Sequence, residues 1–248
     1  MKFIINSDIL SKIFNIQSAL SEEINIFFKE NLISFQNKSA GYTMLSEILV
    51  GKKALGRYEK EKNLNHIKFK LKNIRAFIVS LKNKPVDMTI TKDYITIEYR
   101  NRKLTERLLD ITEDKEFGLP DERTKDALTF DYILSLNAES LNEVIKIGNS
   151  IGDNTNIKSL KKKGILIKIS DTEELSIFEN VFATIKFKKL EDSEAIFTTE
   201  FLIIMLRFLN GTLTLSGGNQ KPIKAEERAL ENVLVKFMVA PKINIKED

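Results

Sequence analysis

The feature that most constrains the fold is a long internal repeat. Residues 6–20 overlay residues 137–151 with their hydrophobic positions in phase, at an offset of about 130 residues. Helical segments around Ile74 and Leu202 match at nearly the same offset. Solenoid repeats are only about 20–50 residues long, so this repeat predicts two similar domains. The alternative is that any two amphipathic helices can be overlaid, but here the order of helices and strands also recurs.

Two hydrophobic periods alternate along the chain and predict its fold class. Helical spacing is found in four stretches, residues 9–20, 74–81, 141–151 and 201–208. Strand-like alternation is found at residues 67–71, 94–99, 165–169, 183–188, 211–216 and 233–239. Four short helices among many strands predict an α+β chain, and 248 residues with 42% hydrophobic content suffice for two cores.

The composition argues against most catalytic chemistry. The chain has no cysteine and a single histidine, His66, for which a surface or capping role is expected. Gly217-Gly218 is an isolated pair and does not form a phosphate loop. The acidic residues lack the spacing of a metal site, and no Ser or Thr stands with an activating base. We therefore expect a binding protein that is not an enzyme and needs no cofactor.

The ends and the hydropathy of the chain bear on its location. No apolar run approaches the roughly 20 residues needed to cross a bilayer. The first six residues lack the basic start and apolar stretch of a signal peptide. The expectation is a protein without a membrane segment or secretion signal, which would be cytoplasmic in an archaeon and nuclear in a eukaryote.

Positive charge is concentrated locally. Residues 60–84 contain eight basic residues and one acid, Glu61, whereas the whole chain carries a net charge of only +4. Residues 158–168 form a second basic cluster. Such runs form either a solvated face or a surface that contacts phosphates. Because Lys predominates and aromatic residues are not interleaved, contact with nucleic acid would be independent of sequence.

Four short motifs, taken in order along the chain, resemble the PCNA-type DNA sliding clamp of archaea and eukaryotes. FGLP at residues 117–120 is similar to the family's interdomain connecting loop, and SIGD at 150–153 to the end of the first helix of its second domain. GNQKPI at 218–223 is similar to a hairpin of archaeal members, and KFMVAPKI at 236–243 to the terminal strand and tail. The resemblance covers essentially the whole chain.

The resemblance implies two domains of one α+β fold, three subunits in a ring, helices lining the hole and antiparallel sheets outside. The domains would span residues 1–111 and 126–248, joined by a connecting loop at 112–125. Double-stranded DNA would be held without sequence preference by basic side chains on the lining helices. By match to these helices, the predicted DNA-binding residues are Lys12, Lys72, Arg75, Lys82, Lys146 and Arg207.

In this family, partner proteins insert a short peptide with one apolar and two aromatic residues beneath the connecting loop. DNA polymerase, flap endonuclease and DNA ligase are the implied partners, together with a clamp loader. The positions that match the pocket are Met44, Phe117, Leu119, Pro222, Met238, Val239, Ala240 and Pro241. Some of these, Met44 and Val239 first, would instead belong to the core. The segment at 37–42 departs from the family pattern, which leaves partner preference open.

Subunits in the family join by pairing an edge strand of one domain with an edge strand of the next subunit. The matching segments here are residues 103–111 and 173–181. Their predicted interface residues are Leu104, Leu108, Leu109, Ile111, Leu175, Ile177 and Phe178. Three alternatives remain open from the sequence: a homotrimer, a specialised subunit of a heterotrimer, and a nucleic-acid-binding or regulatory scaffold that has the fold without closing a ring.

Overall fold

The computed structural model describes residues 1–111, 129–161, 164–171, 173, 176–182 and 186–242. The chain forms two compact units. Unit 1 comprises Met1–Gly41, Leu45–Leu119 and Leu230–Val235, and unit 2 comprises Tyr42–Met44, Pro120–Ala229 and Lys236–Asp248. The connecting loop predicted at 112–125 lies outside the described residues.

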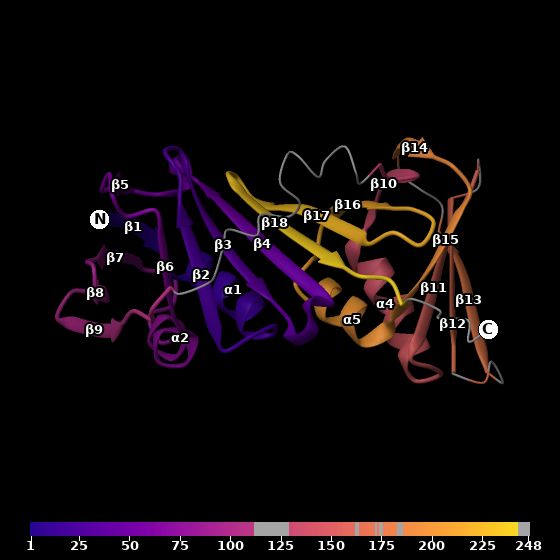
Figure 1. Cartoon of the computed structure of the whole chain (residues 1–248), viewed down its shortest axis with the longest axis horizontal. Coiled ribbons are helices and arrows are strands. Elements are labelled where there is room, and N and C mark those ends of the chain that lie inside the picture. The colour runs from indigo at the N-terminus through magenta and orange to yellow at the C-terminus, as the bar shows by residue number, and fades with distance from the viewer. Residues whose placement is uncertain (112–128, 162–163, 172, 174–175, 183–185, 243–248) are drawn as a thin grey trace. The chain divides into compact units, whose positions relative to one another are not determined.

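Unit 1 contains two helices and two antiparallel sheets (Figure 1). Its sheets have the strand orders β5-β1-β7-β8-β9 and β4-β3-β2-β6. The elements are β1 (Lys2–Asn6), α1 (Ser7–Ser18), β2 (Glu23–Phe28), β3 (Leu32–Lys38), β4 (Met44–Gly51), β5 (Arg57–Glu59), β6 (His66–Lys70), α2 (Leu71–Val79), β7 (Pro85–Ile90), β8 (Tyr94–Tyr99) and β9 (Arg102–Arg107), with short 3-10 helices η1 (Ala40–Tyr42) and η2 (Lys52–Ala54).

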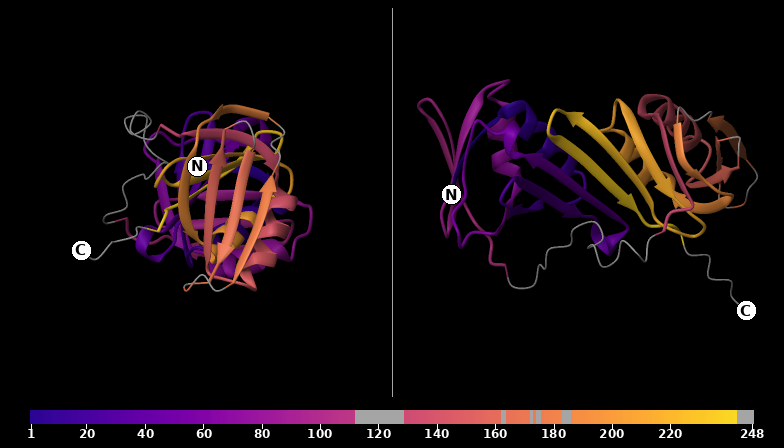
Figure 2. Two further views of the ribbon diagram at one scale, coloured as in Figure 1. Left: turned by 90° about the vertical axis from the view of Figure 1, so that its right-hand side faces the viewer. Right: turned by 90° about the horizontal axis from the view of Figure 1, so that it is seen from above.

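Unit 2 repeats this plan. Its strand orders are β14-β10-β16-β17-β18 and β13-β12-β11-β15, and the left panel of Figure 2 looks onto the second of these sheets. The elements are β10 (Tyr132–Asn137), α4 (Ala138–Asn149), β11 (Asn154–Leu160), β12 (Gly164–Ser170), β13 (Ile177–Phe182), β14 (Lys186–Leu190), β15 (Ser193–Thr198), α5 (Thr199–Leu206), β16 (Thr212–Gly217), β17 (Ile223–Leu230) and β18 (Val233–Val239).

The internal duplication is confirmed in its topology. Every α-helix and strand of unit 1 has a counterpart in unit 2, in the same chain order and at the same place in its sheet. The repeat extends to the helix starts: the side chain of Asn6 caps α1 by accepting from the Asp8 amide, and that of Asn137 caps α4 by accepting from the Ser140 amide. A side-chain oxygen at this position satisfies an amide that otherwise has no partner in the helix. The predicted α+β class with two similar domains is therefore confirmed.

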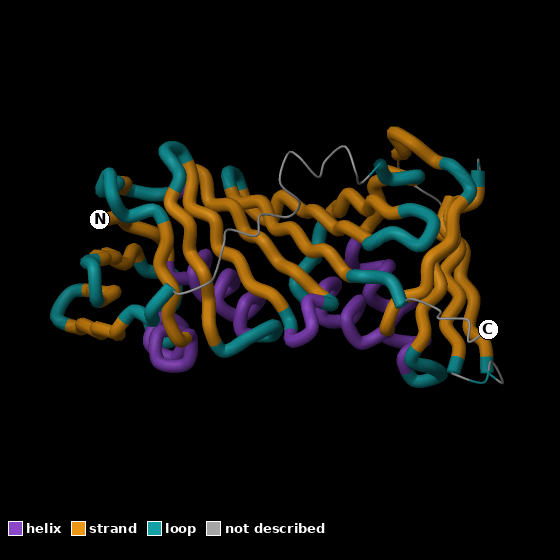
Figure 3. Tube along the Cα trace, in the orientation of Figure 1, coloured by secondary structure: helices purple, strands orange, loops and turns teal. Residues whose placement is uncertain are grey.

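In each unit the helices pack together and cover sheet strands (Figure 3). In unit 1, the Phe14 ring of α1 lies between Phe35 and Phe69, with ring centroids 6.4 and 6.3 Å away. Both pairs are T-shaped, so that the edge of one ring meets the face of the other, which is an arrangement that aromatic side chains prefer. No helix in the part of the chain that the structure describes is long and apolar enough to span a membrane.

Some predicted element ends are wrong, and the backbone gives the reason. Leu71, predicted in a strand, is the first residue of α2. Lys82, predicted on that helix, lies three residues beyond its end, because Lys82 and Asn83 adopt the left-handed conformation at φ 38° and 50°. The other three helices likewise end before the last apolar residue assigned to them, namely Leu20, Ile151 and Phe208.

The SIGD motif contains a glycine that has no room for a side chain. A Cβ at Gly152 would lie 2.0 Å from the carbonyl carbon and oxygen of Ser170, and backbone cannot yield as a flexible side chain does. We expect Gly152→Ala to destabilise unit 2 by about 1–3 kcal/mol, measured by denaturant unfolding. Gly56→Ala is the control, since its Cβ would meet Ile4 at an ordinary 3.4 Å; equal destabilisation by both variants would contradict this account.

Candidate nucleic-acid interface and partner site

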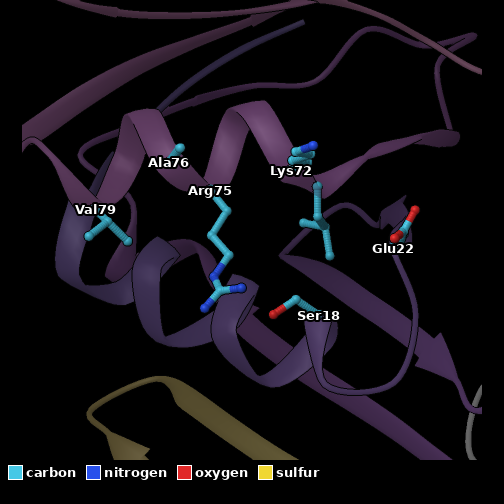
Figure 4. Close-up of a pocket in the computed structure, with 7 residues that line it drawn as sticks. Ser18, Glu22, Lys72, Arg75, Ala76 and Val79 are labelled. Carbon is cyan, nitrogen blue, oxygen red and sulfur yellow. The ribbon is translucent and has the colours of Figure 1, made fainter.

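The helix pair of unit 1 carries a basic pocket. The pocket has a volume of about 500 Å³ and is lined by Ser18, Glu22, Leu71, Lys72, Arg75, Ala76 and Val79. Figure 4 shows Arg75 extending from α2 toward α1, near Ser18. The Arg75 Nε donates to Asn15 Oδ1 at 2.8 Å, which orients the guanidinium. Two of the predicted DNA-binding residues, Lys72 and Arg75, are thus exposed neighbours at one hollow.

The remaining predicted DNA-binding residues are more dispersed. In unit 1, Lys12 is half-buried on α1, and Lys82 is exposed in the turn after α2. In unit 2, Lys146 is exposed on α4, and Arg207 is exposed as the residue that caps the end of α5. The structure gathers Lys72 and Arg75 and leaves the other four on separate turns or helices.

The two helix pairs differ in charge. In unit 1, one exposed acid on α1, Asp8, stands against three bases on the helix pair, Lys12, Lys72 and Arg75, and α2 itself has no acidic residue. In unit 2, three exposed acids on α4 and α5, namely Glu139, Glu143 and Glu200, face only Lys146 and Arg207. Non-specific attraction for a phosphate backbone rests on local positive charge. The helix pair of unit 1 therefore has the more favourable field for DNA.

The residues predicted for the partner site fall into a buried and an accessible group. Met44, Met238 and Val239 are at most 7% exposed, so they belong to the core beneath the site. Ala240 is exposed, while Pro222 and Pro241 are half-buried. Phe117 and Leu119 lie outside the described residues.

Backbone hydrogen bonds bring the accessible group together within unit 2. The Ala240 amide donates to the Thr43 carbonyl at 2.9 Å, and the Lys242 amide donates to the Ile196 carbonyl at 2.7 Å. The Gln220 amide donates to the Glu194 carbonyl on the same strand, β15, at 3.0 Å. Two residues along a strand span about 6.6 Å. The hairpin that holds Pro222 and the tail that holds Pro241 therefore lie next to each other along β15.

The hairpin is anchored by a residue that the sequence analysis missed. The Asp131 carboxylate accepts from the Asn219 amide at 2.7 Å and from the Lys221 ammonium at 2.8 Å. Next to it, burial raises the pKa of the Tyr132 hydroxyl, and the charge of Asp131 raises it further. The tyrosine ring fills the space at Gly217, where a Cβ would lie 2.2 Å from the hydroxyl. No sequence signal links Asp131 to a hairpin about 90 residues away.

A second missed residue is Tyr42, in the divergent 37–42 segment. Gly41 and Tyr42 both adopt positive φ, at 73° and 59°, which turns the chain before β4. The Tyr42 side chain is 64% exposed and precedes Thr43, the residue bonded to Ala240. An exposed aromatic ring beside the tail is a ready contact for an apolar ligand. The only feature of the sequence that pointed to Tyr42 was its place directly after a glycine, Gly41.

The predicted subunit-interface segments coincide with two strands that end their sheets, β9 and β13. Leu104 lies in β9, and Ile177 and Phe178 lie in β13. Leu108, Leu109 and Ile111 follow β9, where the Leu109 amide bonds to the Lys68 carbonyl of β6 at 2.8 Å. Leu175 lies outside the described residues. Among those that are described, no group of three or more His, Cys, Asp or Glu side chains is arranged to hold a metal ion.

Comparison with known proteins adds a fold assignment. No protein-family model matches the chain. No curated protein matches it either. Among solved structures, PCNA from A. fulgidus, determined with the C-terminal region of FEN-1 bound, has a TM-score of 0.83 at 17% identity and covers 98% of both chains.

Two other archaeal structures agree. The PCNA2–PCNA3 complex from Sulfolobus tokodaii has a TM-score of 0.80 at 16% identity, covering 98% of this chain and 99% of that one. PCNA from Thermococcus kodakaraensis has a TM-score of 0.83 at 12% identity, covering 97% and 99%. The resemblance predicted from four motifs is thus confirmed at the level of the fold: over nearly its whole length, this chain has the fold of the PCNA sliding clamps.

Proposed function

We propose that this chain is a subunit of a DNA sliding clamp, which closes into a trimeric ring around duplex DNA. In this role it acts as a processivity factor and as a docking platform for DNA polymerase, flap nuclease and ligase. The observation that carries the proposal is the basic, acid-free exposed side of α2, on a chain with the clamp fold.

The chemistry of the basic residues suits a ring that moves along DNA. Lys72, Lys82 and Lys146 are exposed, flexible ammonium groups without a partner described in the structure. Such groups attract phosphates by releasing counterions and do not read base edges. Each contact is weak, which permits sliding, while the closed ring itself prevents dissociation. No step of this role breaks a covalent bond, so the proposed function is non-enzymatic.

The docking role is supported by the accessible group around Ala240 and by one similar protein. The A. fulgidus PCNA structure contains the C-terminal region of FEN-1. A short peptide that buries one apolar and two aromatic side chains is expected to bind here beside Pro222, Ala240 and Pro241. Concentration of binding energy in a few such anchors is typical of peptide grooves. A closed ring also requires an ATP-driven loader to open it, since this sequence contains no phosphate loop.

The test is topological. A loaded clamp is expected to remain on covalently closed circular DNA through gel filtration and to slide off the same DNA after linearisation with a single cut. Blocking both ends of the linear DNA with bulky protein adducts restores retention. Equal retention on circular and open linear DNA would instead support a scaffold that binds DNA without closing a ring.

A further inference from the structure

The pocket on the helix pair of unit 1 is larger and more apolar than contact with a phosphate requires. Its volume of about 500 Å³ lies within the range of about 300–1,000 Å³ that is typical of sites for small organic molecules. Three of its lining residues are aliphatic, namely Leu71, Ala76 and Val79, and the Val79 side chain is 48% exposed. A phosphate group makes no use of such a wall, so the pocket has room for a ligand with an apolar part.

The α2 side of this pocket offers hydrogen-bond donors in a fixed place. Arg75 Nε is engaged with Asn15 Oδ1 at 2.8 Å, and among the described residues Arg75 makes no other hydrogen bond or ion pair. The two terminal amino groups of its guanidinium are therefore available, and a guanidinium held in this way binds a phosphate through two parallel hydrogen bonds. Lys72, one turn away on α2, adds a second positive charge (Figure 4). This side of the pocket matches a phosphate ester.

The side formed by α1 and the turn after it offers acceptors instead. The Ser18 hydroxyl donates its hydrogen to the Asn15 carbonyl at 3.1 Å, so its oxygen is left to accept from a ligand. Glu22 is exposed, and within the described part of the chain its carboxylate forms no ion pair, not even with Lys72 of the same pocket. The Leu71 amide fixes the Glu22 backbone by donating to its carbonyl at 2.8 Å. Acceptors of this kind match the amino groups of a nucleobase or the hydroxyl of a sugar.

The Glu22 carboxylate also disfavours an ordinary duplex backbone inside the pocket. Along one DNA strand the phosphates follow each other every 3.4 Å or so of helix axis, so a strand that ran through the pocket would bring a second phosphate toward this charge. A repulsive charge of this kind rejects the wrong ligand. The apolar wall acts in the same direction, because extruding a paired base costs a few kcal/mol, whereas a base that is already unpaired enters most easily.

The repeated fold does not by itself require these side chains. Counted from the first residue of each helix, Lys72 of α2 corresponds to Glu200 of α5. Arg75 corresponds to Ile203, and the asparagine that orients Arg75 corresponds to Lys146 of α4. Unit 2 thus keeps the helix pair and has a different set of side chains at these places, so the combination of donors, acceptors and apolar wall belongs to unit 1 alone.

We propose that this pocket binds a single nucleotide whose base is unpaired. Its phosphate lies at Lys72 and Arg75, and its base packs against Ala76 and Val79. The amino or hydroxyl groups of the base or sugar face Glu22. Two sources offer this chemistry, namely a free mononucleotide and an unpaired nucleotide at a bulge, gap or flap in DNA. For the second source the inference rests on the proposed clamp function, because a ring that slides along a duplex is held back where such a nucleotide enters the pocket.

Three short duplexes of one sequence test the inference by fluorescence anisotropy. The first is fully paired, the second carries one extra unpaired nucleotide, and the third carries an abasic residue in place of that nucleotide. We expect the unmodified chain to bind the second duplex at least about tenfold more tightly than the first, and to bind the third about as weakly as the first. An equal gain for the second and third duplexes would show that DNA flexibility is recognised and not the base, which overturns the inference.

Variants that change the pocket and keep its bases place the preference there. Ala76→Phe fills the pocket from an exposed position and should abolish the preference for the unpaired nucleotide, while binding of the paired duplex changes less than about twofold because no charge is lost. Asn73→Phe is the matched control, since it adds the same ring on the side of α2 where Asn73 donates to Glu106, and should keep the preference. Glu22→Gln keeps the side-chain shape and should narrow the preference by tightening binding of the paired duplex. A preference that survives Ala76→Phe overturns the assignment to this pocket.

Isothermal titration calorimetry with a deoxynucleoside monophosphate distinguishes the two sources. Binding that Ala76→Phe abolishes identifies the free nucleotide as a ligand, and no binding together with a retained preference for the unpaired duplex identifies the DNA strand. Neither binding nor preference overturns the inference, and if the loaded chain still persists on circular DNA, the clamp function stands. A preference for the unpaired nucleotide, with equal retention on circular and open linear DNA, supports the pocket and contradicts the clamp function.

Discussion

Replacing Lys72, Arg75 and Lys82 together with alanine is expected to weaken binding of duplex DNA and to flatten its salt dependence. Lys72 and Arg75 share one pocket on α2, a helix that has no acidic residue, and Lys82 follows in the next turn. Each phosphate interaction that the substitutions remove reduces the slope of log K against log salt by about 0.9. The measurement is equilibrium binding to a short duplex by fluorescence anisotropy, at several salt concentrations.

A matched control separates a local interaction from a change in net charge. The variant with alanine at Lys52, Lys53 and Lys60 removes the same charge from exposed positions outside the α-helices. We expect it to shift affinity slightly and to keep the slope. If both triple variants change the slope equally, the helix pair of unit 1 is not the DNA-contacting surface.

The helices of unit 2 should contribute less. Lys146→Ala/Arg207→Ala removes two positive charges from a helix pair that already carries three exposed acids. Because those acids offset the bases, the slope change should be smaller than that of the unit 1 variant. The same anisotropy titration measures it.

The repeated helices were the most predictable part of the fold. Helices α1 and α4 each have one buried face, and the 3.6-residue period marks such a face directly. Strands β2 and β3 gave no such signal, because nearly all their side chains are buried on both faces and alternation disappears. Helix ends were missed for a different reason: Leu81 continues the apolar pattern beyond α2 although its backbone no longer does.

Only those parts of the candidate site that depend on side chains could be predicted from the sequence. Lys72 and Arg75 are three residues apart, so their shared position on a helix follows from sequence. The approach of the tail to the hairpin follows from backbone groups of β15, namely the carbonyls of Glu194 and Ile196. Main-chain hydrogen bonds of this kind leave no mark on residue type, and only the folded chain reveals them.

Ala240→Glu is expected to remove peptide binding while leaving the ring and its DNA affinity intact. Ala240 is exposed, and its only described hydrogen bond is made by the backbone amide to Thr43, which the substitution preserves. A carboxylate there would be buried without a partner when an apolar–aromatic peptide binds, which costs about 1–3 kcal/mol. The affinity for such a peptide should fall about ten- to hundredfold, measured by isothermal titration calorimetry.

Two further variants make this result specific to the tail. Ala19→Glu places the same charge on an exposed alanine at the end of α1 and should leave peptide binding unchanged. Tyr42→Ser removes the exposed ring beside Thr43 and should weaken binding by a smaller factor, since the backbone that holds the tail is kept. Because the tail, the hairpin and the Tyr42 turn are bonded within unit 2, a peptide that binds Ala240→Glu normally must dock elsewhere, and the partner site would then have to be sought away from β15.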